Sequence, residues 1–177
     1  GVPLYRLLDL PAPAALATSF TIAIAEPDEM ARLAVEAARW PILKLKLGSD
    51  DDAARLAAVR AARPDACLRV DANAGWTYAQ ALDLIPTLAQ FDLELIEQPL
   101  PRGDIEGVRA LRQQLRQQGI MTPIFVDESV RSARDVAAHA GAVDGVVIKL
   151  MKTGGLREAL RAIHTALALD MQVMLSC

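Results

Sequence analysis

The chain alternates between short apolar runs and longer stretches in which apolar residues recur at helical spacing. The runs are rich in Val, Ile and Leu and are bounded by Gly, Pro, Asp or Ser, which is typical of buried strands. We predict strands at residues 19–24, 42–47, 67–72, 93–98, 124–129, 145–150 and 171–175. Single helices between successive runs indicate parallel strands joined by right-handed crossovers.

The stretch from 104 to 119 shows the clearest helical period. Asp104 can cap its start and Gly119 can end it. Its apolar stripe consists of Ile105, Val108, Leu111 and Leu115. Two further helices are predicted to begin at Thr77 and within the Ser-Asp-Asp-Asp cluster at 49–52.

Charged residues stand near the carboxyl end of five successive runs, at intervals of 22 to 30 residues. These residues are Lys46, Asp71, Glu97, Asp127 and Lys149. The interval is the length of one βα unit, since a barrel of eight such units has about 250 residues. No Gly-x-Gly-x-x-Gly turn follows the first run, which argues against a dinucleotide-binding sheet. We therefore predict an α/β fold, a (β/α)8 TIM-type barrel.

Seven predicted strands do not close an eight-stranded barrel, so we expect it to be incomplete, with about seven βα units and the last strand missing. Residues 1–17 are predicted to form a short Leu-rich helix and a Pro/Ala linker, the tail of an N-terminal domain. Residues 18–177 are predicted to form the partial barrel domain. We expect the chain to be a fragment of a longer enzyme.

Three of the charged residues are carboxylates on adjacent strands, namely Asp71, Glu97 and Asp127. Converging carboxylates repel each other unless a cation joins them, and oxygen ligands suit Mg²⁺. Lys46 and Lys149 fall on the second and sixth strands, which face each other in a closed barrel of eight. Opposed lysines beside a metal that stabilises an enolate predict epimerisation at the carbon next to a carboxylate.

Lys44 shares its strand face with Lys46, because side chains two residues apart point the same way. We expect the charge of Lys44 to lower the pKa of Lys46 and to help bind a substrate carboxylate.

Each charged residue has a simpler explanation when taken alone. A strand-end carboxylate is more often a helix cap, and Lys149 could extend its ammonium from a strand end into water. Five charges in one barrel opening favour a site, because each would otherwise be buried there without a partner.

Other chemical features carry less weight. Residues 151–155 (Met-Lys-Thr-Gly-Gly) lack the spacing of a phosphate-binding loop and predict a tight turn. His139 and His164 lie in Ala-rich predicted helices outside the barrel, and Cys67 opens a strand at the end away from the charges. We expect none of these three to react.

Composition limits the possible partners. The chain has 177 residues, is 53% hydrophobic and carries a net charge of −3, which does not suit a nucleic-acid binder. Two cysteines are too few for a disulfide framework, so a cytoplasmic location is expected. No apolar stretch is long enough for a membrane span, and the first residues do not resemble a signal peptide.

Five stretches resemble the enolase superfamily, in its muconate-lactonising subgroup and, within it, the dipeptide epimerases of the L-Ala-D/L-Glu epimerase type. They read LKLKLG, RVDANAGWT, LIEQPLP, FVDESV and VIKLMKTGGL, in order, over about residues 18–177. The resemblance implies a Mg²⁺-dependent 1,1-proton transfer at the α-carbon of the C-terminal residue of a dipeptide, through an enolate. A homo-oligomer is expected at full length.

The resemblance also assigns roles to single residues. Asn73 would support the metal ligands, and Thr18 and Ser19 would lie near the substrate. The implied acid/base catalysts are Lys46 and Lys149, and the implied metal ligands are Asp71, Glu97 and Asp127.

The sequence departs from the family at Ala74, where such proteins often have Gln. Two larger parts of the family are expected to be missing from this sequence, namely the N-terminal capping domain and the eighth strand with its Asp-x-Asp motif.

Other functions are also compatible with the sequence. The alternatives are a muconate cycloisomerase or o-succinylbenzoate synthase of the same superfamily, an inactive or structural barrel fragment, and a phosphate-binding barrel enzyme.

Overall fold

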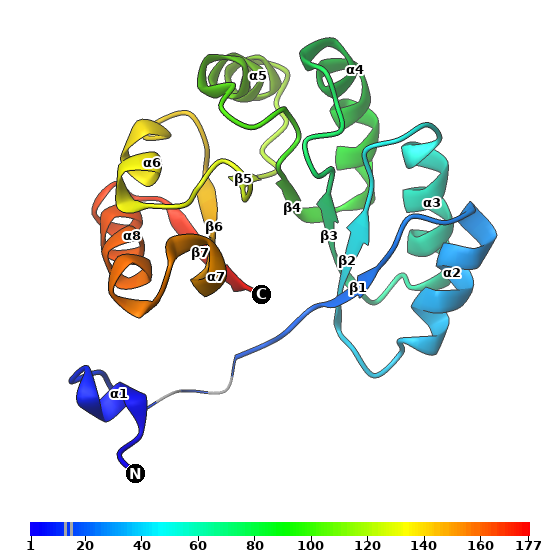
Figure 1. Cartoon of the computed structure of the whole chain (residues 1–177). Coiled ribbons are helices and arrows are strands. Elements are labelled where there is room, and N and C mark those ends of the chain that lie inside the picture. Colours follow the sequence, from blue (N-terminus) through cyan, green and yellow to red (C-terminus); the bar gives the residue numbers. More distant parts are fainter. Residues whose placement is uncertain (13, 15) are drawn as a thin grey trace.

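The structure is a computed structural model that describes residues 1–12, 14 and 16–177. Residues 13 and 15, which belong to the predicted Pro/Ala linker, lie outside the described residues. In the described part of the chain, seven parallel strands form one sheet whose order follows the sequence (Figure 1). The strands are β1 (Phe20–Ile22), β2 (Ile42–Lys46), β3 (Cys67–Asp71), β4 (Leu93–Glu97), β5 (Ile124–Val126), β6 (Gly145–Lys149) and β7 (Gln172–Ser176).

All seven predicted strands are confirmed, with changes at their ends. The prediction for 124–129 was too long, because the chain leaves β5 after Val126 and residues 127–129 form a loop. Hydrogen bonds to the side chain of Gln98 hold this loop in place of strand pairing. The first strand is likewise shorter than predicted, and the last is displaced by one residue.

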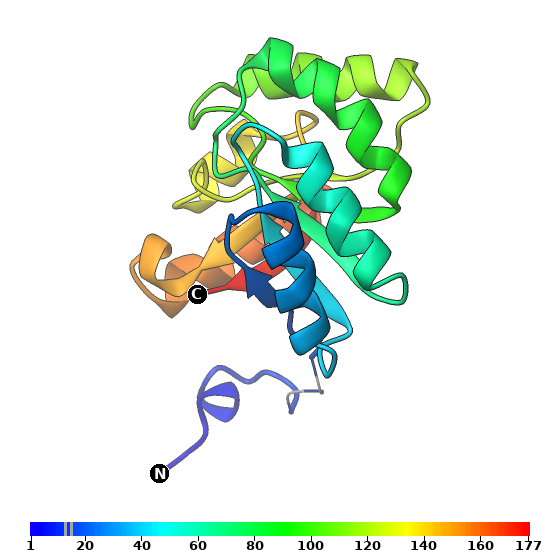
Figure 2. The same ribbon diagram turned by 90° about the vertical axis from the view of Figure 1, so that its right-hand side faces the viewer.

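Helices cover the outer, convex face of the sheet (Figures 1 and 2). They are α2 (Pro27–Glu36), α3 (Asp52–Ala62), α4 (Tyr78–Leu88), the 3₁₀ helix η1 (Ala89–Phe91), α5 (Ile105–Gln117), α6 (Ala133–Ala138) and α8 (Leu156–Ala168). A short helix, α7 (Leu150–Thr153), directly follows β6. The helix α1 (Leu4–Leu7) has no buried residue and lies apart from the sheet.

The predicted helix starts are confirmed. Asp104 caps α5 by accepting a hydrogen bond from the Gly107 amide at 2.9 Å. Thr77 and Gln80 form a capping box at the start of α4. The α5 helix is followed by Gly119 at φ +79°, a left-handed conformation that glycine adopts without strain.

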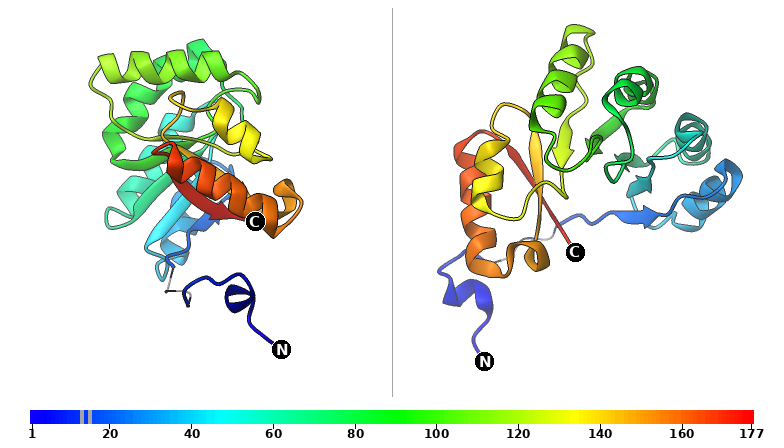
Figure 3. Two further views of the ribbon diagram at one scale, coloured as in Figure 1. Left: turned by 90° about the vertical axis from the view of Figure 1, so that its left-hand side faces the viewer. Right: turned by 45° about the horizontal axis from the view of Figure 1, so that its top comes forward.

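The sheet curls into an incomplete α/β barrel. In the part of the chain that the structure describes, β1 and β7 are the two edges and do not pair with each other. The segment that leads into β1 crosses the open side near β7 (Figure 3).

The two faces of each strand serve different purposes. On β2, Leu43 and Leu45 are fully buried in the core beneath the helices, whereas Lys44 and Lys46 take the alternate, concave face. A smaller apolar cluster on the concave side consists of Leu95, Phe125 and Val147, with Met174 packed against it. The fold therefore places its main core outside the sheet and leaves the concave face for polar groups.

No helix among the described residues has the length and apolar character needed to cross a membrane.

Candidate active site

The charged residues predicted from the sequence lie at the carboxyl ends of neighbouring strands. Lys46, Asp71 and Glu97 are the last residues of β2, β3 and β4 and are level with one another in the sheet. Asp127 directly follows β5, and Lys149 ends β6. The strands β2 and β6 are on opposite sides of the curled sheet (Figure 1), so the two lysines belong to opposing walls.

Asp71 and Glu97 are completely buried, and lysines balance their charge. The Nζ atom of Lys44 lies 2.8 Å from Oδ2 of Asp71 and 2.7 Å from Oε2 of Glu97. Nζ of Lys46 donates to Oδ2 of Asp71 at 2.8 Å. Lys44 thus lies between two carboxylates, one step below the strand ends. The contact between Lys44 and a substrate carboxylate stays a prediction.

Asp127 is paired on both of its oxygens. Nζ of Lys149 lies 2.7 Å from Oδ2, and Lys152 contacts Oδ1 and the backbone carbonyl oxygen of the same aspartate. Lys152 was predicted only as part of a tight turn. That turn is confirmed, since Gly154 ends α7 at φ +74°. The signal that could have identified Lys152 is its position three residues after Lys149, which one helical turn brings to the same side.

The three carboxyl groups have different proton affinities. Burial raises the pKa of Glu97 to about 7, the negative charge of Asp71 acts in the same direction, and Lys44 compensates only in part. Burial also opposes ionisation of Asp71 and Asp127, but their paired lysines outweigh it and hold both pKa values below the usual range. For Lys44 and Lys149, burial opposes the charge, yet the neighbouring carboxylates raise the pKa of both.

Two loop residues hold the site together. The side-chain oxygen of Asn73 accepts from Nζ of Lys46 at 2.8 Å, and its backbone N–H donates to Oδ1 of Asp71 at 3.0 Å. Gln98, which the sequence analysis missed, is buried, and its Oε1 accepts from the backbone N–H groups of Asp127 and Ser129. Gln98 directly follows Glu97, so one side chain couples the ends of β4 and β5.

The donor set fits a hard divalent cation in its chemistry. All three predicted ligands offer only carboxylate oxygens, which suit Mg²⁺. Oε1 of Glu97 accepts a hydrogen bond from Lys44. The buried Oε2 of Glu97 lies close to the same nitrogen but has no hydrogen-bond partner in the described part of the chain. Among the described residues, no three His, Cys, Asp or Glu side chains are arranged to hold a metal, and each carboxylate contacts an ammonium group instead.

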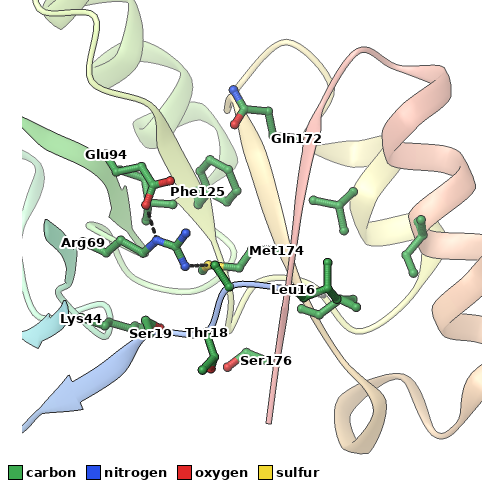
Figure 4. Close-up of a pocket in the computed structure, with 15 residues that line it drawn as sticks. Leu16, Thr18, Ser19, Lys44, Arg69, Glu94, Phe125, Gln172, Met174 and Ser176 are labelled. Atoms are coloured by element: carbon green, nitrogen blue, oxygen red, sulfur yellow. Dashed lines mark hydrogen bonds and ion pairs between the residues drawn. The ribbon is translucent and has the colours of Figure 1, made fainter. Parts of the chain in front are cut away.

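A cavity of about 500 Å³ lies on the concave side (Figure 4). Thr18, Ser19 and Lys44, the predicted substrate contacts, all line it, together with residues of β7. Lys46 and Lys149 do not line it, so the cavity adjoins the charged site through Lys44.

The residues expected to be unreactive lie outside this site. His139 is buried on the outer side of the sheet, with Nδ1 2.8 Å from the carbonyl oxygen of Asp135, and His164 is exposed on α8. Cys67 begins β3, at the opposite end of the strand from Asp71, and burial raises the pKa of its thiol to about 11. A thiol at that pKa stays protonated at neutral pH and is a poor nucleophile.

Together, the fold and site define a parallel α/β barrel protein with its chemical groups at the carboxyl ends of the strands. Residues 28–177 match the family described as "Enolase C-terminal domain-like", and the chain belongs to this family.

Curated relatives of the chain are named as epimerases. The chain is 44% identical over 185 residues to a hydrophobic dipeptide epimerase of Roseobacter litoralis, covering 100% of this chain and 52% of the relative. It is 39% identical over 179 residues to an L-Ala-D/L-Glu epimerase of Bacteroides thetaiotaomicron, covering 100% of this chain and 45% of the relative. The chain thus spans about half the length of these relatives.

Solved structures of similar proteins include complexes with Mg and a dipeptide. A dipeptide epimerase from Cytophaga hutchinsonii, complexed with Mg and D-Ala-L-Val, matches with a TM-score of 0.92 and 30% identity, over 99% of this chain and 48% of that one. A dipeptide epimerase from Enterococcus faecalis, complexed with Mg and L-Leu-L-Tyr, matches with a TM-score of 0.86 and 38% identity, over 92% of this chain and 46% of that one.

Proposed function

We propose that this chain provides the proton-transfer residues of a Mg²⁺-dependent dipeptide epimerase. The reaction is a 1,1-proton transfer that inverts the α-carbon of the dipeptide's C-terminal residue. The observation that supports this most strongly is the placement of Lys46 and Lys149 on opposing walls, with buried carboxylates on the strands between them. The names and bound dipeptides of similar proteins support the substrate class.

Asp71, Glu97 and Asp127 would hold the metal. When bound, Mg²⁺ supplies positive charge beside the substrate carboxylate and so lowers the energy of the enolate. Lys44 would add further positive charge beneath this carboxylate.

The two lysines divide the proton transfer between them. With one epimer, neutral Lys46 accepts the α-proton, and the electron pair of the C–H bond moves into the carboxylate. Lys149, held as an ammonium ion by Asp127, then donates a proton to the opposite face of the α-carbon. The other epimer reacts with the roles exchanged, so the two amines carry one proton between them at the start of each turnover.

The substrate would lie above Lys44, between the carboxyl ends of the strands. Thr18 and Ser19 precede β1, on the amino-terminal side of Lys44, so their contact with the substrate stays an expectation from the resemblance. A homo-oligomer and a cytoplasmic location remain expectations from the sequence.

The proposal is tested by incubating the protein at its full natural length with L,L-dipeptides and Mg²⁺ in D₂O. Deuterium should appear at the α-carbon of the C-terminal residue, together with the L,D diastereomer. Lys149→Ala should abolish inversion, whereas Arg161→Ala, on the exposed face of α8, should leave it intact. Absence of exchange with every dipeptide, or turnover of muconate or o-succinylbenzoate precursors instead, would contradict it.

A further inference from the structure

Glu128 is a half-buried acid beside the site, and the mechanism assigns it no task. It follows Asp127 in the loop after β5, and its buried Oε2 atom has no hydrogen-bond partner among the residues that the structure describes. It takes part in none of the ion pairs found among the described residues. An unpaired buried carboxylate oxygen lowers the stability of the fold, so the presence of this one needs an explanation.

The other oxygen of Glu128 connects it to a proposed catalyst. Oε1 accepts a hydrogen bond from the side-chain N–H of Asn73 at 3.0 Å, and the side-chain oxygen of Asn73 accepts from Nζ of Lys46 at 2.8 Å. An ionised carboxylate can only accept hydrogen bonds. It therefore orients the amide with its nitrogen toward Glu128 and its oxygen toward Lys46. The reversed amide would direct N–H groups at the lysine and an oxygen at the carboxylate.

The backbone of Asn73 adds to this control. Its φ of +45° is a left-handed conformation that asparagine tolerates better than most residues. Its N–H donates to Oδ1 of Asp71. The side chain is thus fixed at both ends, between Glu128 and Lys46.

The amine of Lys46 has a defined geometry as a result. Two of its N–H bonds are directed to Oδ2 of Asp71 and to the side-chain oxygen of Asn73, both at 2.8 Å. A tetrahedral nitrogen then has one remaining direction for the lone pair or for the proton that is transferred. We propose that Glu128 is a positioning residue that acts through Asn73 to direct the amine of Lys46 at the α-carbon. This inference rests on the proposed function and deepens it.

Stereospecific exchange tests the role of Glu128 in the protein at its full natural length. Lys46→Ala first identifies the epimer whose α-proton faces Lys46, because exchange from that epimer is lost. Glu128→Leu removes the acceptor and should slow exchange from this epimer by about 10- to 100-fold, as for other partners that orient a functional side chain. Exchange from the other epimer, which uses Lys149, should change little. Glu128→Gln keeps an acceptor of the same size and should restore much of the rate.

The control is Glu106→Leu, on the exposed side of α5, which should match the wild type for both epimers. Equal slowing of both epimers in Glu128→Leu would indicate a general structural role and overturn the inference. Unchanged exchange in Glu128→Leu, with exchange lost in Lys46→Ala, would overturn it while leaving the proposed function intact. Wild-type exchange from both epimers in Lys46→Ala would instead refute the proposed function.

A crystal structure of Glu128→Leu gives a readout that needs no turnover. Nζ of Lys46 is expected to leave the side-chain oxygen of Asn73 and to occupy more than one position. A single Lys46 conformer that keeps the 2.8 Å contact would overturn the inference.

Discussion

At the scale of single residues, Glu97 differs from the other two carboxylates in how its charge is balanced. Asp71 and Asp127 each contact two lysines, whereas Glu97 shares Lys44 with Asp71. Burial and the charge of Asp71 therefore raise the pKa of Glu97 to about 7. In the metal-free protein, this group takes up a proton that the unfolded chain would release.

The raised pKa makes the stability of the metal-free protein depend on pH. The stabilisation is fully present below about pH 4.5, the ordinary pKa of a glutamate, and is lost as the pH rises to about 7. At about 1.4 kcal/mol per pKa unit, the free energy of unfolding should fall by about 3 kcal/mol over this range. Urea unfolding in EDTA at a series of pH values measures this change in the free energy of unfolding.

Glu97→Gln is the control for this pH dependence, because an amide does not titrate. Its stability should be nearly flat between pH 4.5 and 7. The pKa values of Asp71 and Asp127 are lowered, so their contributions are lost only in more acidic solution. A wild-type protein that becomes more stable toward pH 7 would contradict the prediction.

Lys152 is expected to stabilise the ionised form of Asp127. Lys152→Met should lower the free energy of unfolding at pH 7 by about 1–3 kcal/mol, since a buried acceptor loses a charged partner. Because the folded-state pKa of Asp127 is depressed, this loss should shrink as the pH falls below about 3.8. Chemical denaturation at several pH values measures both effects.

Arg161→Met provides the matched control for Lys152→Met. It removes an ion pair with Glu158 in which the arginine side chain is 70% exposed, and it should cost less than about 1 kcal/mol. Equal effects of the two substitutions would show that Lys152 is only a surface charge.

At the scale of elements, the strands were predictable because each buried strand is an apolar run that ends at a polar residue. Asp71 and Lys149 could be placed for that reason alone. The contacts of Gln98, Glu128 and Lys152 could not be predicted, because they depend on how loops and the short α7 helix turn back over the strand ends. Lys44 was assigned to the correct face, but its position between two carboxylates depends on the register of three strands.

The close approach of β5 and β6 permits a test of packing on the concave face. A Cβ atom added to Gly145 would lie 2.4 Å from the ring of Phe125, which is too close for contact. Gly145→Ala should therefore lower the free energy of unfolding by about 1–3 kcal/mol, as overpacking does. Adding Phe125→Leu to this variant should recover part of the loss, measured as a double-mutant cycle. Strictly additive effects would contradict the proposed clash.

At the scale of the whole molecule, the curled sheet separates two kinds of surface. The outer face is covered by helices, and the concave face carries the charged site and the adjoining cavity. Within the described residues, the sheet ends at β1 and β7, whose outer edges have no strand beside them. Leu175 on β7 is 61% exposed at such an edge.

An unpaired edge with exposed apolar side chains is a surface for association with another strand. The 177-residue chain, expressed by itself, should therefore form dimers or larger species in sedimentation velocity as its concentration rises. Leu175→Lys should shift the distribution toward monomer, because a charge at the edge opposes pairing with a second copy. Leu167→Lys introduces the same charge at a leucine that is 59% exposed on α8, away from the sheet edge, and should have little effect. Equal shifts from both variants would attribute association to net charge, and a wild-type chain that stays monomeric would show that the edge is protected.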